Sequence, residues 1–466
     1  MARKHPNNGS EGYNSRWGRT RLYQHWSEVS WATSLRCGRK TLLCSFSLHL
    51  IECPKDVKIV SKGYYMANGI NMSPDKRHIL YMWQICLNTM CMCSIKKTIH
   101  LAPVKVNRFQ MGKLVLISLV IAALSALLGE RILNLRKRTL ASRELVRNHL
   151  PNCVTLKHLS HGSEDITVVR DGLAFISTGL KYPGLPGSDV PGKIYSVDLQ
   201  DPRMKPVELR MPRNFDLDIF NPHGISAYID TNDDEIYLFV VNHPQHKSQV
   251  EVFRFVEDDH SLVHLNTIKH ELLYSLNDIV AVGVDSFYAT NDHYFSHEIF
   301  KAVVEPLLFQ PWSNVVYYSP KDVKIVSEGY YMANGINMSP DKRHIYVADV
   351  LDHNVHLLER KEDNTLAPVK SVALGSLCDN IEVDPETGDL WLGCHPNGWK
   401  MFVSDPNDPP GSEVIRIQKI HSDEPVVTQV YADDGQVIMG SSVATTYGGK
   451  LLIGTVFHKA LVCDLK

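Results

Sequence analysis

The stretch EIYLFVVNHPQHKSQVEVFRF, residues 235–255, decides the fold of this chain. Two runs of β-branched and aromatic residues flank a short cluster of turn-forming residues, a pattern that indicates two strands with a connection between them. Similar runs recur at short intervals after residue 151, at residues 173–177, 193–197, 315–318, 344–349, 355–359, 389–393 and 450–456. Asp-rich turns such as DPETGD, residues 384–389, separate them. Many short strands with regular turns predict a sandwich, a barrel or a propeller.

Length favours the propeller among these three all-β folds. The roughly 315 residues after residue 150 are too many for one sandwich, but about six four-stranded blades accommodate them at roughly 50 residues a blade. We expect one helical excursion on the propeller face, at residues 297–309, because this stretch has an apolar side.

Four cysteines lie in this part of the chain. Cys153 stands at its start and Cys463 near its end, so a disulfide between them would join the first strand to the last and close the ring. Cys378 and Cys394 are then left as free thiols. The alternative is that all four are buried thiols.

Residues 1–110 differ from the rest of the chain. They carry 17 Lys and Arg against 5 Asp and Glu, a net charge of +12, whereas the remainder carries −14. Residues 54–79 repeat residues 320–345 with a single difference, Lys62 for Glu328. Structural repeats recur throughout a fold, so one near-identical copy indicates a duplicated or mis-joined coding segment. We expect residues 1–110 to be an anomalous extension, disordered or a product of mis-joining, outside the functional protein.

An uncharged run, LVLISLVIAALSALL at residues 114–128, follows Met111 and Lys113. Its length suits the apolar region of a signal peptide and is short for a bilayer span of about 20 residues. We expect residues 111–150 to form a signal or anchor helix region, and residues 151–466 to form the propeller. The alternative for the apolar run at residues 114–128 is a buried helix. The run predicts entry into the secretory pathway, with an extracellular, lipoprotein-associated or membrane-anchored destination.

Composition and motifs exclude several function classes. A net charge of −2 provides no basic surface for nucleic acid. Ten cysteines in 466 residues are too few for a disulfide scaffold. The sequence contains no G-x-S-x-G, H-E-x-x-H, P-loop or G-x-G-x-x-G motif, which argues against a serine hydrolase, a zincin or a nucleotide-dependent enzyme.

Acid and amide residues recur at the ends of several expected strands. They are Glu164, Asp165, Asn277, Asp278, Asn334, Asp379 and Asn380. Oxygen ligands without clustered His or Cys favour Ca²⁺, and the central channel of a propeller would gather one contribution from each blade. Each pair alone is more consistent with a strand-end turn or cap, and only the whole set on a propeller makes a metal site an equal alternative.

Two histidines, His223 and His243, end strands beside turn residues. A His pair near a cation could act as a general base toward water. The alternative is that both are ordinary surface or hydrogen-bonded histidines.

The second part of the chain resembles the paraoxonase family of calcium-dependent lactonases and arylesterases. The segments that carry the resemblance are GSEDI, GLAFISTGLKYPG, FNPHGIS, VVNHP, LNDIVAVG, TNDHYF, ANGIN, VDPETGDLW, GCHPNG and GTVFHKAL. The resemblance runs from about Met111 to the C-terminus. It implies a six-bladed β-propeller with two central calcium ions and an N-terminal hydrophobic helix.

The resemblance also implies roles for individual residues. The catalytic calcium would be held by Glu164, Asn277, Asn334, Asp379 and Asn380. The structural calcium would be held by Asp165, Asp278 and the carbonyl of Ile225. Further implied features are a His223–His243 dyad, Tyr182 at the mouth, a Cys153–Cys463 disulfide and a free thiol at Cys394. Cys378, beside the Asp379–Asn380 pair, departs from the family pattern.

These expectations combine into one hypothesis and one rival. The hypothesis is hydrolysis of lipophilic lactones and aryl esters, with the carbonyl polarised by calcium and water activated by the dyad. The N-terminal helix would hold the protein at a membrane or lipoprotein surface. The sequence is also compatible with assembly into a homo-oligomer. The rival is a calcium-bound propeller that serves as a membrane or lipoprotein binding module without turnover.

Overall fold

The computed structural model describes residues 32–37, 40–45, 108–159, 161–183, 185, 190–403, 405 and 407–465. The chain divides into two compact units, Met1–Val104 and Lys105–Lys466. In the first unit, strands β1 (Ala32–Cys37) and β2 (Lys40–Ser45) form an antiparallel pair, which the sequence did not predict. The repeated segment, residues 54–79, lies outside the described residues.

The second unit contains six four-stranded antiparallel sheets, which we call blades 1 to 6. Blades 1 to 3 consist of β4 (Asp165–Val168), β5 (Leu173–Thr178), β6 (Lys193–Asp198) and β7 (Val207–Glu208); β8 (Pro222–Ile229), β9 (Ile236–Asn242), β10 (Gln249–Val256) and β11 (Ser261–Ile268); and β12 (Leu276–Gly283), β13 (Ser286–Asn291), β14 (Ser313–Ser319) and β15 (Asp322–Tyr330). Blades 4 to 6 consist of β16 (Ala333–Met338), β17 (His344–Asp349), β18 (Asn354–Arg360) and β19 (Leu366–Ala373); β20 (Cys378–Val383), β21 (Leu390–Cys394), β22 (Ser412–Gln418) and β23 (Val426–Asp433); and β24 (Ser441–Tyr447), β25 (Lys450–Thr455), β26 (Leu461–Asp464) and β3 (Val154–Thr155).

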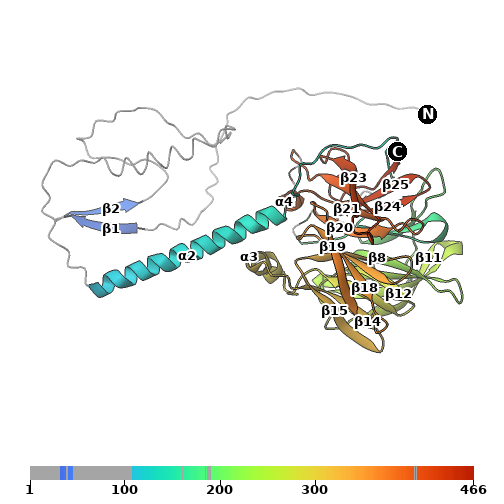
Figure 1. The fold of residues 1–466 in the computed structure, drawn as a ribbon, viewed down its shortest axis with the longest axis horizontal. Helices are drawn as coiled ribbons and strands as arrows, with labels where there is room; N and C mark the ends of the chain where they lie inside the picture. The colour runs from blue at the N-terminus through green and yellow to red at the C-terminus, as the bar shows by residue number, and fades with distance from the viewer. Residues whose placement is uncertain are drawn as a thin grey trace, which may run out of the picture. The chain divides into compact units, whose positions relative to one another are not determined.

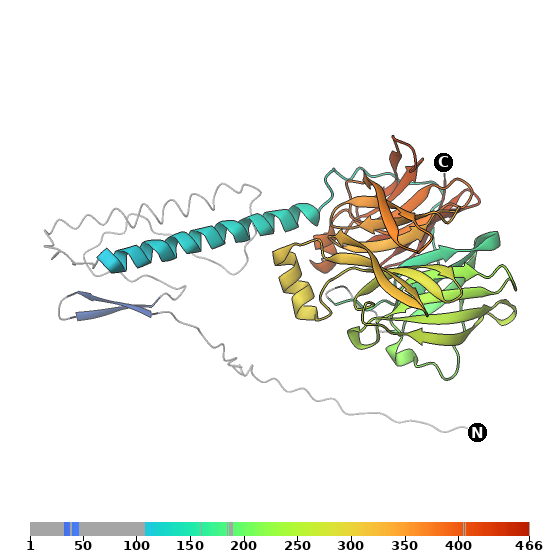
Figure 2. The same cartoon turned by 60° about the horizontal axis from the view of Figure 1, so that its bottom comes forward.

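The predicted six-bladed propeller is confirmed (Figures 1 and 2). The first strands of successive blades, β4, β8, β12, β16, β20 and β24, contact one another in a ring. Apolar side chains of adjacent blades pack together between the sheets, as Tyr346 and Leu357 of blade 4 do with Leu392 and Ile415 of blade 5. The core therefore lies between blades, and the polar groups of the inner strands lie around the central axis.

The ring closes where the two ends of the propeller domain meet. Strand β3 pairs with β26, so blade 6 combines the first and last strands. The predicted disulfide between Cys153 and Cys463 is present and links positions 310 residues apart. The closure that the sequence predicts is thus confirmed.

The other cysteine prediction is wrong, because Cys394 is not a free thiol. It is disulfide-bonded to Cys378, its direct partner in the pairing of β20 with β21. Sequence separation alone does not show that residues 378 and 394 face each other across a hairpin. The family pattern has a cysteine only at the position of Cys394, so it did not predict a partner for it.

Most inner strands carry a one-residue β-bulge at the same place. In β12, Leu276 pairs with Asn291 and Ile279 with Ala289, so three steps on β12 oppose two on β13. Strands β8, β16 and β20 repeat this offset, and β24 has a related one. A bulge re-aims side chains that would otherwise alternate between faces. The bulges explain why adjacent residues such as Asn277 and Asp278 both belong to the buried centre.

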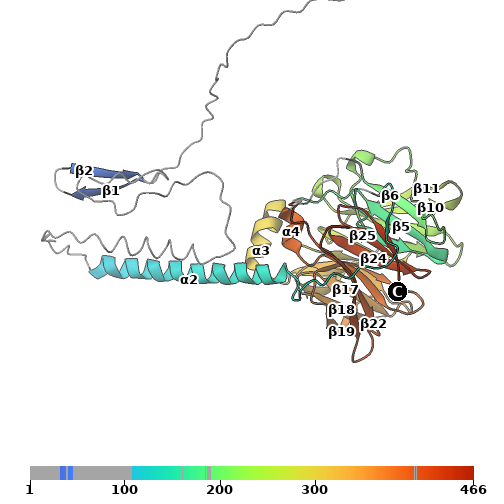
Figure 3. The ribbon, with the colours of Figure 1, turned by 90° about the horizontal axis from the view of Figure 1, so that it is seen from above.

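Three helical elements accompany the propeller. The helix α2 (Arg108–Arg138) contains the predicted apolar run, and its Val115–Arg138 portion is long and apolar enough to cross a membrane, with none of it buried. The predicted excursion appears as a π-helical turn, η5 (Phe300–Val304), continuing into α3 (Glu305–Leu308). Helix α4 (Gly398–Val403) follows β21. Both α3 and α4 lie beside the C-terminal end of α2 (Figures 1 and 3).

The C-terminal end of α2 is attached to the propeller by specific contacts. Arg138 donates a hydrogen bond to Asp352 at 2.7 Å, and its guanidinium lies 3.9 Å from the centre of the Tyr331 ring. Arg131 donates to the carbonyl of Leu308 in α3. The described part of the propeller also contains the 3₁₀ segments η1 (Arg170–Gly172), η2 (Leu217–Ile219), η3 (Pro244–His246) and η4 (Glu257–Asp259).

Candidate functional site

The centre of the ring gathers the oxygen-bearing residues that the sequence singled out. Four of their side-chain oxygens are buried and lack a hydrogen-bond partner among the described residues: Glu164 Oε2, Asn277 Oδ1, Asn334 Oδ1 and Asn380 Oδ1. They come from or directly before the inner strands of blades 1, 3, 4 and 5. Leaving a buried polar atom unpaired costs about 1–3 kcal/mol. Four such oxygens, one from each of four blades, fit the donor set of a hard cation such as Ca²⁺.

Hydrogen bonds between blades support these four residues. The side-chain amide of Asn380 donates to Glu164 Oε1 and to the Glu164 carbonyl, both at 3.0 Å. Ser442 of blade 6 donates to the same carbonyl at 2.6 Å. The fifth predicted ligand, Asp379, is 5% exposed and interacts with the side chain of Asn334. All five predicted ligands of the catalytic calcium therefore lie in the buried ring centre.

Asp165 and Asp278 lie in the same ring but have different partners. Each carboxylate caps the next blade: Asp165 accepts from Ile225 N at 2.8 Å, and Asp278 accepts from Ile336 N at 2.7 Å. Gly224 allows this close packing, since a Cβ there would lie 2.5 Å from Asp278 Oδ1. A cavity of about 190 Å³ adjoins both carboxylates and the buried Glu382. The structure thus brings the predicted structural-calcium residues together, and Ile225 contributes its backbone N–H to Asp165.

The carboxylates at the centre have unusual acidities. Burial, followed by repulsion from Glu164, raises the pKa of Asp165 from 3.8 to about 8. Burial and then the Asp165 charge raise the pKa of Asp278 well above its ordinary value, and burial and then the Glu164 charge do the same for Asp379. Several like charges in a buried space destabilise one another unless protons or a cation neutralise them.

The two predicted histidines are in contact. His223 Nδ1 lies 3.0 Å from His243 Nε2, and the second ring nitrogen of His223 lies 3.4 Å from Glu164 Oε1. Ser248 Oγ lies 3.3 Å from His243 Nδ1 and completes the row. Burial, and then repulsion from His223, lower the pKa of His243 to about 3. His243 is therefore neutral at physiological pH and can accept a hydrogen bond from His223.

Tyr182 packs edge-on against His223, with ring centroids 6.4 Å apart, and it belongs to a network that the sequence did not predict. Its hydroxyl lies 3.1 Å from His293 Nε2, and His293 Nδ1 lies 2.7 Å from Glu305 in α3. Asp292, which is 5% exposed, accepts from Ser275 Oγ at 2.7 Å. The sequence carried these residues only within TNDHYF, one of the segments of the family resemblance, with no role assigned to them.

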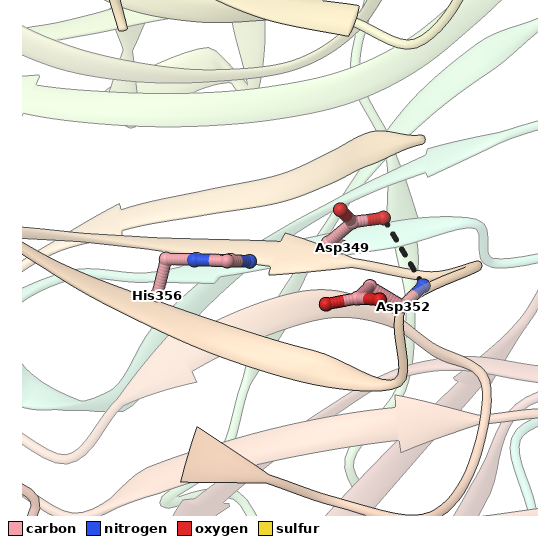
Figure 4. Close-up of side chains that lie close together, drawn as sticks. All are labelled: Asp349, Asp352 and His356. Carbon is pink, nitrogen blue, oxygen red and sulfur yellow. Dashed lines mark hydrogen bonds between the residues drawn. The ribbon is translucent and has the colours of Figure 1, made fainter. Parts of the chain in front are cut away.

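A further group, Asp349, Asp352 and His356, has candidate metal-binding atoms within 4.8 Å of one another (Figure 4). Its carboxylates already have partners. Asp349 accepts from the backbone N–H groups of residues 331–332, and Asp352 binds Arg138. A guanidinium on one carboxylate and a loop cap on the other occupy the oxygens that a cation would need. The ring centre, with its unpaired oxygens, fits a metal better.

The family model described as Arylesterase matches residues 23–119 and 144–465. Serum paraoxonase/arylesterase 2 of Gallus gallus is 58% identical over 357 residues, which make up 76% of this chain and 100% of that protein. The corresponding human protein is 56% identical, and serum paraoxonase/lactonase 3 of Rattus norvegicus is 51% identical, with the same coverage.

Proposed function

The chain belongs to the arylesterase family, and from this membership we propose that it hydrolyses lactones and aryl esters with a calcium ion at the centre of its propeller. The relatives carry the words arylesterase and lactonase in their names, which supports both substrate classes. The single observation that carries the calcium proposal is the set of four buried, unpaired side-chain oxygens contributed by four blades.

The four unpaired oxygens of the ring centre support one cation, and the family resemblance extends the proposal to a second. Glu164, Asn277, Asn334, Asp379 and Asn380 would hold the catalytic ion. Asp165, Asp278 and the carbonyl of Ile225 would hold the structural one. When bound, the catalytic calcium supplies Lewis-acid polarisation of the substrate carbonyl and stabilises the negative charge that develops on its oxygen. The five residues would supply fewer than the 6–8 oxygen ligands that Ca²⁺ usually takes.

His223 is the proposed base. His223 would accept the water proton at Nε2 and become an imidazolium, with its Nδ1–H donating toward His243. Neutral His243, 3.0 Å away, is placed to accept that hydrogen bond. Glu164, 3.4 Å from His223, orients the ring and offsets a positive charge on it. Tyr182, whose hydroxyl lies 3.1 Å from His293 Nε2, would line the mouth of the site.

The apolar surface of α2 supports a location at a membrane or lipoprotein surface. Val115, Leu116, Leu119 and Leu124 are each at least 58% exposed, which is unusual for side chains in water. The disulfides and the apolar helix suit a secreted or signal-anchored protein. A lipid surface there would favour lipophilic lactones as substrates.

The first test is hydrolysis of an aliphatic lactone and of phenyl acetate, with calcium and after EGTA. We expect turnover that EGTA abolishes and added calcium restores. His223→Gln should lower kcat by roughly 10²–10⁴-fold, the usual contribution of a general base. The matched control is His356→Gln, in the Asp349 group, which should leave kcat and the calcium requirement unchanged.

Two outcomes would contradict this proposal in different ways. Full lactonase activity of His223→Gln would remove the dyad from the mechanism and leave Glu164 or Asp379 as the proton acceptor. Folded, calcium-loaded wild-type protein without turnover would favour the rival function, a binding module at a lipid surface.

A further inference from the structure

The Cys378–Cys394 disulfide lies at a position that has a defined role in other blades. It joins the first residue of inner strand β20 to the last residue of β21. The ligand pair Asp379–Asn380 follows Cys378 directly and occupies the bulge before Ile381, which pairs with Leu392. The disulfide therefore fixes one end of the bulge that carries both residues.

At the same register, three other blades use an Asn or Asp side chain. Each terminates the second strand of its blade and accepts a hydrogen bond from the backbone N–H of the residue that precedes the bulged inner strand. The three bonds are Asn221 N to Asn242 Oδ1 at 2.8 Å, Ser275 N to Asn291 Oδ1 at 3.0 Å and Met332 N to Asp349 Oδ1 at 2.9 Å. Each of these side chains anchors the start of a bulge, and we call them Asx anchors.

Blade 5 has Cys394 in place of an Asx anchor. Its direct partner is Cys378, as Leu276 is the partner of Asn291 in blade 3. The side chain of cysteine has no oxygen to accept a backbone N–H, so a covalent bond holds the strands where the other three blades have a hydrogen bond. Both sulfur-bearing residues are buried, with 2% and 0% exposure.

The neighbouring contacts extend from the disulfide to the ligands. Ser441 Oγ of blade 6 donates to the Cys394 carbonyl at 2.6 Å, and the next residue, Ser442, donates to the Glu164 carbonyl at 2.6 Å. On the other side, Asn337 Nδ2 donates to the Ile381 carbonyl at 2.7 Å. The bulge in β20 is thus held at both ends, and at its N-terminal end the support includes the disulfide.

We propose that the Cys378–Cys394 disulfide is a positioning element for the metal site, and that it sets calcium affinity by holding Asp379 and Asn380 in place. This inference rests on the proposed function, because it assigns those two residues to calcium. Groups that orient metal ligands typically change metal affinity by about 10–100-fold when they are removed. Loss of the disulfide is expected to fall in that range.

The test compares the full wild-type chain with two double variants and one single variant. Cys378→Ala/Cys394→Ala removes the link. Cys378→Leu/Cys394→Asn installs the Leu–Asn pair of blade 3 and should restore an Asx anchor. Ile417→Ala, in the same hydrophobic cluster of blade 5 but on β22, is the control for lost packing. Non-reducing peptide mapping of the wild type verifies the link.

The readouts are calcium dissociation constants from equilibrium dialysis, together with the unfolding temperature. We expect one of the two calcium sites to weaken about 10–100-fold in the Ala/Ala variant, to recover at least partly in the Leu/Asn variant, and to stay unchanged in Ile417→Ala. Lactone turnover at saturating calcium should recover in the Ala/Ala variant, because the ligands themselves are intact.

Several results would overturn the inference. An unchanged dissociation constant in a folded Ala/Ala variant would do so, as would an equal loss of affinity in Ile417→Ala. A folded Leu/Asn variant that binds calcium as weakly as the Ala/Ala variant would refute the equivalence with the Asx anchors. Failure of the proposed function looks different, since wild-type protein itself would then bind no calcium or would turn over after EGTA.

Discussion

Three aspartates at the ring centre make the calcium-free protein sensitive to pH. The pKa of Asp165 is about 8 in the fold and 3.8 ordinarily, because of burial and then the Glu164 charge. A carboxyl group whose pKa is raised by folding binds its proton more tightly in the folded state. Its contribution to stability is complete below about pH 4 and is lost as the pH rises through about 8. Asp278 and Asp379 are shifted in the same direction.

We therefore expect protein freed of calcium by dialysis to unfold at a lower temperature at pH 8 than at pH 5.5, and calcium to restore the stability at pH 8. Differential scanning calorimetry at both pH values measures this. Asp165→Asn keeps the shape and removes one charge, so the calcium-free variant should lose part of the pH dependence. Equal melting temperatures of calcium-free wild type and variant at pH 8 would contradict the argument.

The sequence was informative at the residue scale where one side chain has one role. Glu164, His223 and Asn277 were candidates by residue type and position at strand ends, where turn, cap and surface roles were also open, and the family resemblance selected them. The role of Cys394 was mispredicted because it depends on which residue lies opposite, a fact of strand register. His293 and Asp292 were missed because their importance comes from contacts with Tyr182 and Ser275, which a single segment does not reveal.

At the scale of elements, the strands could be predicted from their apolar runs, whereas the bulges could not. A bulge arises from the relation between two strands. Gly335 illustrates its packing: a Cβ at this position of β16 would lie 2.4 Å from the Asp379 carbonyl oxygen and 2.6 Å from Asn380 Cα. Since both are backbone atoms of the next inner strand, they cannot turn aside as a side chain would.

Gly335→Ala should consequently displace β16 or β20. We expect a loss of roughly 1–3 kcal/mol in the free energy of unfolding, as for other overpacked positions, and about tenfold weaker calcium binding. Denaturant unfolding and calcium titration measure the two effects. Gly388→Ala is the control, because its Cβ would meet no atom within 4 Å while its φ of 70° still strains an alanine. If both variants bind calcium alike, the packing of β16 on β20 does not govern the site.

At the scale of the whole molecule, one closed ring contains everything that the proposed chemistry needs. The closing disulfide joins residues 153 and 463, and every predicted site residue lies between them. A link across 310 residues stabilises the ring mainly by restricting the unfolded chain, an effect of several kcal/mol in entropy-based estimates. None of the predicted ligands, the two dyad histidines or the strands of the six described blades falls within residues 1–110.

Removal of residues 1–110 should accordingly leave the enzyme intact. The relatives align over their whole length with 76% of this chain, and the ring closes without the extension. We expect the chain starting at Met111 to have the kcat/KM for a lactone, the calcium requirement and the melting temperature of the full chain, each measured per mole of folded protein. Equal kinetics with altered partition into lipid vesicles would assign the +12 charge of the extension to surface binding. A loss of kcat/KM at equal melting temperature would instead mean that the extension acts on the site, against its expected place outside the functional protein.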